Sequence, residues 1–102
     1  MEITAKELKE KIKNGDKILV DFWASWCGPC RILKPEFEKA SKSYEGDLQF
    51  FTLNIDNDTD FAVHEMNIFS VPTIKGFKDG QEVYNSVGLK NHKDLIEIAK
   101  NI

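Results

Sequence analysis

The chain has 102 residues and a net charge of −3, with 41% apolar and 30% charged residues. This length predicts one domain, residues 1–102, that can bury a core without a disulfide or a metal. Because acidic and basic residues are interspersed, we expect neither nucleic acid nor an anionic membrane as a partner. No segment approaches the roughly 18–20 apolar residues of a membrane span, and no export signal is visible. We therefore expect a cytoplasmic protein in a reducing compartment.

The first half of the chain predicts alternating helices and strands. Thr4 and Glu7 form a potential capping box, which predicts a short helix that ends at residues 14–16. Residues 17–23 are apolar with almost no alternation, which is typical of a strand covered on both faces. A long amphipathic helix follows the cysteines, and residues 48–56 predict a second strand.

The second half predicts a further helix over residues 58–67, two strands over 71–77 and 82–87, and a last helix capped by Asn91. The tight turn at 78–81 makes the last two strands antiparallel, and strands joined through helices are expected to be parallel. The sequence therefore predicts an α/β fold, a three-layer α/β/α sandwich with a central mixed sheet.

The only two cysteines, Cys27 and Cys30, are three positions apart, and they could bind a metal or exchange electrons. A closed zinc site needs four ligands. The only other candidates, His64 and His92, lie 28 residues apart on different predicted helices. The spacing therefore argues against a zinc site.

The position of the cysteines favours redox chemistry. Cys27 falls where a buried strand ends and a helix begins, and the free N–H groups and positive dipole of a helix N-terminus favour a thiolate. Cys30 lies one turn further, where it could attack a mixed disulfide formed at Cys27. Gly28 leaves room for an approaching backbone, and Pro29 has no N–H to lose in the first turn. So short a loop gains little as a structural bridge, and we predict dithiol–disulfide exchange.

Four further residues lie around the cysteines, and three of them have two possible interpretations. Asp21, inside the apolar run, either reaches water at a sheet edge or is buried with a raised pKa, in which case it could take a proton from Cys30. Trp23 is either a core residue or part of the site, and Trp26 is expected on the surface of the site. Pro72 opens a strand, where its peptide bond is either trans or cis, and the base rate alone favours trans.

The motif WCGPC, preceded by VDFWAS and followed by Pro35, VPT and Gly88, resembles the thioredoxin family over essentially the whole chain. The resemblance implies a thioredoxin fold and a protein-disulfide reductase that carries electrons in cell redox homeostasis. The Gly-Pro pair between the cysteines is that of the family's reducing members. Two alternatives remain, an oxidase or isomerase on the same fold and a non-catalytic binding module of a larger assembly.

By matched position, the resemblance implies that Cys27 is the nucleophile, that Cys30 is the resolving thiol and that the two form a redox-active disulfide. It implies that Asp21 is the buried proton acceptor and that Pro72 is a cis-proline facing the disulfide. Val71 would hydrogen-bond the substrate backbone. The implied substrate-binding surface consists of Trp26, Gly28, Pro29, Val71, Pro72 and Gly88.

The resemblance also implies the partners. No cofactor is bound, and NADPH acts indirectly through a flavoprotein thioredoxin reductase that restores the dithiol. Family clients include ribonucleotide reductase, peroxiredoxin and methionine sulfoxide reductase. We expect a monomer, because the apolar surface predicted around the site is small.

Several features depart from the family pattern, and three of them carry structural expectations. The first strand is short, within residues 1–3, or missing. Thr52 stands where a lysine often pairs with the buried acid, so we expect a higher pKa for Asp21 than in relatives. Lys75 and Gly76 are expected to interrupt the third strand and weaken sheet packing.

Overall fold

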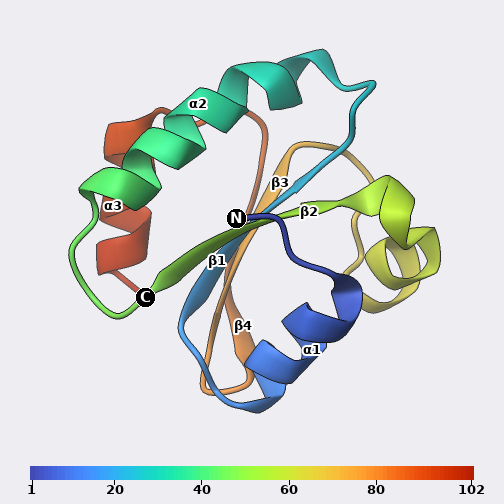
Figure 1. Cartoon of the computed structure of the whole chain (residues 1–102), viewed down its shortest axis with the longest axis horizontal. Helices are drawn as coiled ribbons and strands as arrows, with labels where there is room; N and C mark the ends of the chain where they lie inside the picture. Colours follow the sequence, from blue (N-terminus) through green and yellow to red (C-terminus); the bar gives the residue numbers. More distant parts are fainter.

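The computed structural model describes residues 1–102, and helices and strands alternate along the chain except where two strands follow one another before the last helix (Figure 1). The elements are α1 (Ala5–Lys13), β1 (Ile18–Trp23), α2 (Gly28–Ser43), β2 (Gln49–Asn54), the 3₁₀ turn η1 (Ile55–Asn57), the π-type turn η2 (Phe61–Glu65), β3 (Thr73–Lys78), β4 (Gln81–Val87) and α3 (His92–Lys100). The predicted capping box between Thr4 and Glu7 is present at the start of α1. None of the helices combines the length and the apolar character needed to cross a membrane.

The four strands form one mixed sheet in the order β2-β1-β3-β4. Strands β1 and β2 are parallel, whereas β3 runs antiparallel to both β1 and β4. The prediction that β3 is parallel to the earlier strands was therefore wrong. Between β2 and β3 the chain forms only the 3₁₀ turn over residues 55–57 and a short helical segment over residues 59–65. At about 1.5–2 Å per residue they are too short to carry the chain back along a six-residue strand, so β3 starts at the end where β2 stops.

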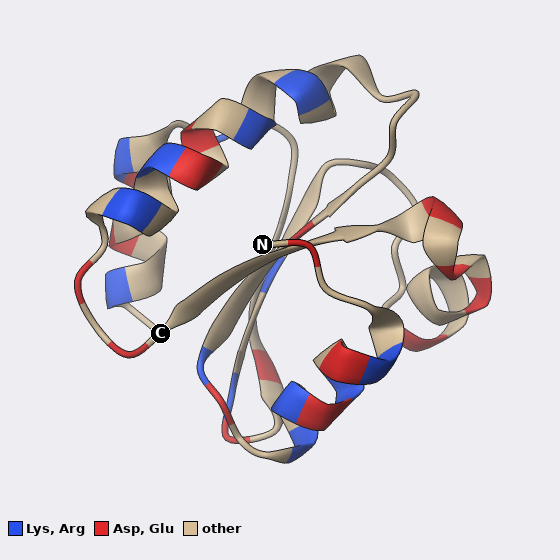
Figure 2. Cartoon of the chain, viewed as in Figure 1, with Lys and Arg blue, Asp and Glu red and all other residues tan.

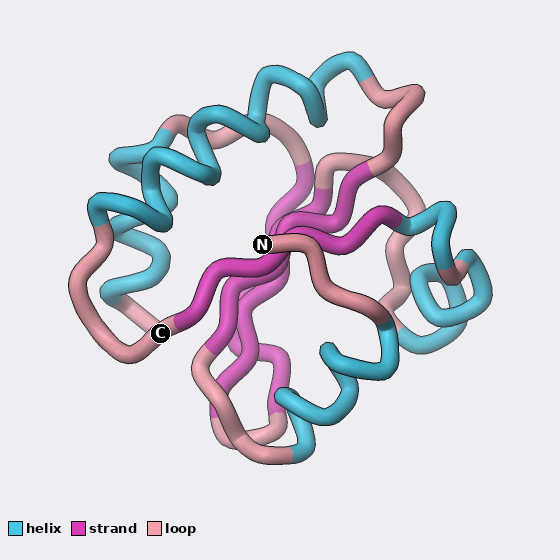
Figure 3. Tube along the Cα trace, viewed as in Figure 1, coloured by secondary structure: helices cyan, strands magenta, loops and turns pink.

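Helices cover both faces of this sheet, as the sequence predicted. Figure 3 shows the strands in the centre, with α2 and α3 on one side and α1 and the two short turns on the other. Strand β1 is buried from Ile18 to Phe22, and its side chains alternate between the two cores. Ile18, Val20 and Phe22 belong to the core beneath α1, and Leu19 belongs to the core beneath α2 and α3. The same alternation directs Asp21 toward the α2 face.

The predicted helix over residues 58–67 is present as a shorter helical segment, in which residues 59–60 are α-helical and continue into the π-type turn Phe61–Glu65. The Asp58 Oδ1 accepts a hydrogen bond from the Phe61 N–H at 3.0 Å, so Asp58 caps the turn. Asn67 ends the segment with a positive φ of 56°. The buried residues of the turn are Phe61 and Ala62. The helical segment therefore begins directly after Asp58, as the sequence predicted, and ends two residues earlier than expected.

Strand β3 continues through Lys75 and Gly76, so the predicted interruption was wrong. The Lys75 side chain is buried, and its Nζ donates a hydrogen bond to Glu82 Oε1 on β4 at 2.7 Å. A Cβ at Gly76 would collide with the side chain of Ile102, which fills that space. The irregularity that remains is a shift of register between Gly76 and Phe77.

The predicted short first strand is reduced to one parallel bridge between Glu2 and Thr52 on β2. The Ile3 N–H donates to Thr52 O at 2.8 Å, and the Thr52 N–H donates to Met1 O at 2.9 Å. The outer edge of β2 is therefore covered at its C-terminal half. Figure 2 shows basic and acidic residues mixed on α1, α2 and α3, so no helix carries a single sign of charge.

Candidate redox active site

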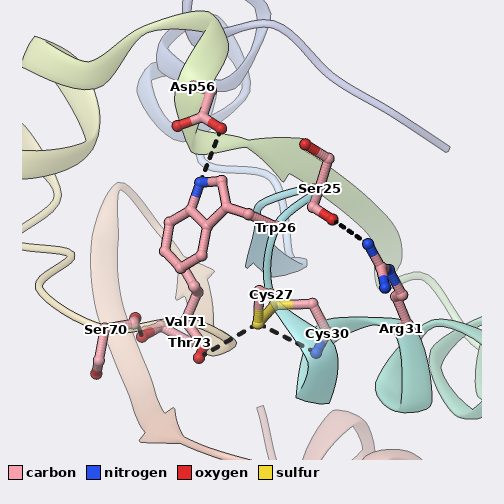
Figure 4. The surroundings of a disulfide bond; sticks show 9 residues. All are labelled: Ser25, Trp26, Cys27, Cys30, Arg31, Asp56, Ser70, Val71 and Thr73. Atoms are coloured by element: carbon pink, nitrogen blue, oxygen red, sulfur yellow. Dashed lines mark hydrogen bonds between the residues drawn. A yellow bond between two sulfur atoms is a disulfide. The ribbon is translucent and has the colours of Figure 1, made fainter.

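The two cysteines form a disulfide at the N-terminus of α2 (Figure 4). Cys27 is the N-cap residue, and the Cys30 N–H donates to Cys27 Sγ at 3.2 Å. Both residues are 4% exposed. Once the disulfide is reduced, the same N–H and the helix dipole stabilise a thiolate on Cys27. The structure thus confirms the prediction that the two cysteines lie where a strand is followed by a helix.

The segment before β3 lies against this disulfide. The Val71–Pro72 peptide bond is cis, as the resemblance implies. The carbonyl oxygen of Val71 lies 3.6 Å from Cys27 Sγ, and the Pro72 carbonyl accepts the Gly88 N–H at 2.9 Å. These contacts bring the start of β3 and the end of β4 to the sulfur atoms.

Asp21 is buried, with 2% of the residue exposed. Because β1 is an inner strand, the alternative of an edge position in contact with water is excluded. The Asp21 Oδ1 has no hydrogen-bond partner. Burial, and then the charge of Glu2, raise the pKa of Asp21 to about 7. Asp21 and Cys30 line the same pocket, which has a volume of about 700 Å³.

Two side-chain contacts hold the segment that precedes the disulfide. The indole N–H of Trp26 donates to Asp56 Oδ2 at 3.1 Å, and the Trp26 residue remains 67% exposed. The Arg31 guanidinium donates to the Ser25 carbonyl at 2.8 Å. Sequence reasoning missed Asp56 and Arg31, because their partners are determined by the tertiary structure and carry no motif.

The residues expected at the substrate-binding surface come from three segments that the structure brings together. Gly28 and Pro29 are exposed beside Trp26, whereas Val71 and Gly88 are half-buried and Pro72 is buried. The sequence analysis did not single out two exposed apolar neighbours of these segments, Phe69 and Leu89.

Glu2 was also missed, although its carboxylate makes three contacts. Its Oε1 accepts hydrogen bonds from the Trp23 indole N–H at 2.9 Å and from Thr52 Oγ1 at 2.7 Å. Its Oε2 accepts the Asn54 N–H at 2.7 Å. Trp23 is therefore neither a fully buried core residue nor a surface residue, since its half-buried ring reaches the N-terminal segment.

The structure contains no group of three or more His, Cys, Asp and Glu residues that could hold a metal ion. His64 lies in η2, and His92 begins α3. The His92 Nδ1 lies 3.0 Å from Glu36 Oε1, which also accepts the His92 N–H at 2.9 Å. This pair ties α3 to α2.

Comparisons with known proteins agree with this geometry. The model of the thioredoxin family matches residues 1–101. A thioredoxin of Mycoplasma genitalium is 40% identical over 96 residues, which cover 94% of this chain and 92% of that protein. Oxidised mitochondrial thioredoxin 3 of Saccharomyces cerevisiae is similar in structure, with a TM-score of 0.82 and 32% identity over 97% of this chain and 91% of that one.

A second solved chain has the same TM-score of 0.82 and 32% identity, over 95% of this chain and 89% of that one. Its structure is described as the basis of thiol resolution in a yeast mitochondrial 1-Cys peroxiredoxin via glutathione and thioredoxin systems. With the family model, the relatives and the Cys27–Cys30 disulfide in agreement, this chain belongs to the thioredoxin family of thiol–disulfide oxidoreductases.

Proposed function

We propose that the protein is a cytoplasmic protein-disulfide reductase whose dithiol is restored by a flavoprotein thioredoxin reductase at the expense of NADPH. The observation that carries the proposal is the position of the disulfide. Cys27 caps α2, and Cys30 shares a pocket with the buried, unpartnered carboxyl of Asp21. These positions support the proposal that Cys27 reacts as a thiolate and that Asp21 accepts the proton of Cys30.

In the first step, the Cys27 thiolate attacks one sulfur of a client disulfide. A mixed disulfide forms between Cys27 and the client, and the second client sulfur leaves as a thiolate. The Cys30 N–H, which donates to Cys27 Sγ, and the N-terminus of α2 stabilise the attacking charge. Cys27 is thus proposed as the nucleophile.

In the second step, Cys30 transfers its proton to Asp21, and the resulting thiolate attacks Cys27 Sγ. The mixed disulfide breaks, the client leaves as a thiolate and the Cys27–Cys30 disulfide forms. Two electrons have then passed from the two cysteines to the client. The pKa of Asp21, about 7, suits an acceptor that works near neutral pH.

The client is proposed to dock over Trp26, Gly28 and Pro29 on one side of the disulfide, and over Val71, Pro72 and Gly88 on the other. The exposed indole of Trp26 supplies apolar area, and the backbone of Val71 is proposed to form hydrogen bonds with an extended client segment.

We propose clients of the peroxiredoxin, ribonucleotide reductase and methionine sulfoxide reductase classes. The structure related to a yeast peroxiredoxin supports the first of these. No nucleic acid or membrane takes part, and we propose that the protein acts as a monomer without a cofactor of its own.

Insulin reduction by dithiothreitol, followed by turbidity, tests the proposal. Catalytic amounts of the wild type should accelerate precipitation, while Cys27→Ser should be inactive. Cys30→Ser should stop at the mixed disulfide, which mass spectrometry would detect as a covalent adduct with insulin. A wild type no faster than dithiothreitol alone would contradict the proposed reductase.

A second assay addresses the supply of electrons and the direction of the reaction. With a bacterial thioredoxin reductase, NADPH oxidation at 340 nm should depend on this protein, on its Cys27–Cys30 disulfide and on insulin. The reduction potential should lie near that of reducing family members, roughly −270 mV. A potential near −120 mV would indicate an oxidase instead.

A further inference from the structure

The N-terminal segment places a second carboxylate at the pocket beneath the disulfide. Glu2 and Asp21 both line this pocket, together with Cys30. The Glu2 carboxylate is held there by the hydrogen bonds from Trp23, Thr52 and the Asn54 backbone. Three donors fix its position, although residue 2 itself is exposed. These three hydrogen bonds distinguish Glu2 from a surface glutamate whose carboxylate contacts only water.

Thr52 connects the two carboxyl groups. It lies directly beside Asp21 in the register of β1 and β2, so their side chains share one face of the sheet. The Thr52 hydroxyl nevertheless donates to Glu2 at 2.7 Å, and Asp21 Oδ1 is left without a partner. The Thr52 hydroxyl thus orients the Glu2 carboxylate and forms no hydrogen bond with Asp21.

The remaining charged groups around the pocket cannot replace Glu2. The basic groups are Arg31 and Lys34 of α2 and the amino group of Met1, and Glu38 of α2 is the other acid. Arg31 is engaged with the Ser25 carbonyl. No ion pair joins Asp21 to any of these cations at 4.0 Å or less. The Glu2 carboxylate therefore acts on an Asp21 carboxyl that has no cation paired with it.

We propose that Glu2 is a positioning residue of the exchange reaction, whose fixed negative charge keeps the Asp21 carboxyl ready to take and return the proton of Cys30. The inference rests on the proposed role of Asp21 in the resolving step. A like charge disfavours ionisation of a neighbouring carboxyl, and a carboxylate that binds its proton more tightly is a stronger acceptor. Glu2 itself touches neither sulfur nor client.

The alternative role of Glu2 is purely structural, as a clamp on the edge of β2. Both roles predict some loss of stability on substitution, so stability does not distinguish them. Only the proposed role predicts that the charge of Glu2, and not merely its hydrogen bonds, moves the titration of Asp21.

Carbon-13 NMR of aspartate-labelled oxidised protein tests this directly, with Asp21→Asn to assign the resonance. Glu2→Gln, which removes the charge at nearly constant shape, should lower the titration midpoint of Asp21 by about 0.5–1 pH unit. The midpoint should stay above that of an ordinary aspartate, because burial is the larger cause of the shift.

Two control variants separate charge from shape. In Glu2→Asp, which keeps the charge, the titration midpoint of Asp21 should stay within about 0.3 pH unit of the wild-type value. Glu10→Gln on the exposed face of α1 is the matched control and should change nothing. An unchanged midpoint in Glu2→Gln, or equal shifts in Glu2→Gln and Glu2→Asp, would overturn the proposal.

A second measurement needs no variant of Glu2. Coupling is reciprocal, so the carboxyl resonance of Glu2 in glutamate-labelled wild type should show an inflection at the Asp21 midpoint. That inflection should disappear in Asp21→Asn. If it is absent in the wild type, the proposal fails even where Glu2→Gln does not fold.

The kinetic consequence is read from the release of 5-thio-2-nitrobenzoate after mixing reduced protein with Ellman's reagent. The first released equivalent reports attack by Cys27, and the second reports resolution by Cys30. Glu2→Gln should shift the pH profile of the second phase to lower pH by the same amount as the Asp21 titration midpoint measured by NMR. It should have no such effect in an Asp21→Asn background.

If the wild type reduces insulin but Glu2→Gln leaves this pH profile unchanged, the role of Glu2 is refuted and the reductase function stands. A wild type inactive with insulin would instead refute the function.

Discussion

Asp21 and Lys75 are two buried ionisable residues on adjacent inner strands of the same sheet, and their surroundings differ. Asp21 is 2% exposed and Lys75 is 4% exposed. The Lys75 Nζ contacts Glu82 Oε1 at 2.7 Å, whereas Asp21 Oδ1 has no partner and borders a pocket that it shares with Cys30.

The difference shows how burial can serve either stability or chemistry. A buried ion that finds its counter-ion stays charged, and the pair has a mainly structural effect. A buried carboxyl without a counter-ion is stabilised in its neutral form, and its pKa rises toward the pH at which the protein works. The unsatisfied carboxyl lines the same pocket as Cys30, and the satisfied amine lies on β3 opposite Val20. The following predictions test this contrast, from the largest expected effect to the smallest.

Asp21→Asn should stabilise the protein in a pH-dependent way. The pKa of Asp21 is raised from 3.8 to about 7, so the folded state favours the protonated form. The resulting penalty on folding is absent below pH 4, grows between pH 4 and pH 7 and is complete above pH 7, where it reaches about 4 kcal/mol. Urea denaturation of the oxidised protein should therefore show a gain of up to about 4 kcal/mol at pH 8 and almost none at pH 4. Equal gains at both pH values would mean that ionisation of Asp21 is not the cause.

The same substitution should slow the resolving step. Without a proton acceptor at position 21, release of the second thionitrobenzoate should fall by about 10²-fold, or about 2.7 kcal/mol in activation free energy. The first phase should change much less, because the activation proposed for Cys27 comes from the helix N-terminus and not from Asp21. Lys75→Met is the matched control: it removes the other buried charge and should leave both phases unchanged. Equal slowing of both phases in Asp21→Asn would contradict a specific action on Cys30.

Breaking the Lys75–Glu82 pair should affect stability alone. Glu82→Gln leaves the Lys75 ammonium buried beside a neutral amide, and should cost about 1–2 kcal/mol, less than for a fully buried pair because the Glu82 side chain is 43% exposed. Lys75→Met removes the charge together with its need for a partner, and should lie within about 1 kcal/mol of wild type. Urea midpoints of both variants and of the double variant decide the question. A larger loss in Lys75→Met than in Glu82→Gln would show that the pair is net stabilising.

An ion pair at the surface should contribute least. The Lys17 Nζ lies 3.5 Å from Asp47 Oδ1, and the Asp47 side chain is 77% exposed. Asp47→Asn should change the free energy of unfolding by less than about 0.5 kcal/mol, and high salt should abolish the difference. A loss comparable to that of Glu82→Gln would mean that burial is not what separates these pairs.

Local patterns were enough to predict the fold class and the family. The apolar run of β1, the Thr4–Glu7 capping box and the tight turn with positive φ at Asp79 and Gly80 are all present. Each depends on residues within a few positions of one another. The cysteine motif predicted the disulfide for the same reason, since the geometry of a strand followed by a helix is local.

Contacts between distant segments could not be predicted. The antiparallel direction of β3, the Glu82 partner of Lys75 and the Asp56 partner of Trp26 depend on where the chain returns. The two β3 residues expected to disrupt packing illustrate the limit. The space that a side chain at Gly76 would occupy is filled by the side chain of Ile102, which is distant in sequence.

The sequence by itself determined the alternation that points Asp21 away from the α1 core, and the pair of cysteines at the start of α2. Only the tertiary structure decided that Asp21 remains without a counter-ion while Lys75 obtains one. It also decided that Glu2 is held at the pocket of Asp21 by three donors from β1 and β2. The reason is physical: the ionisation of a buried group depends on every charge and dipole within several ångströms, and the chain assembles those neighbours only when it folds.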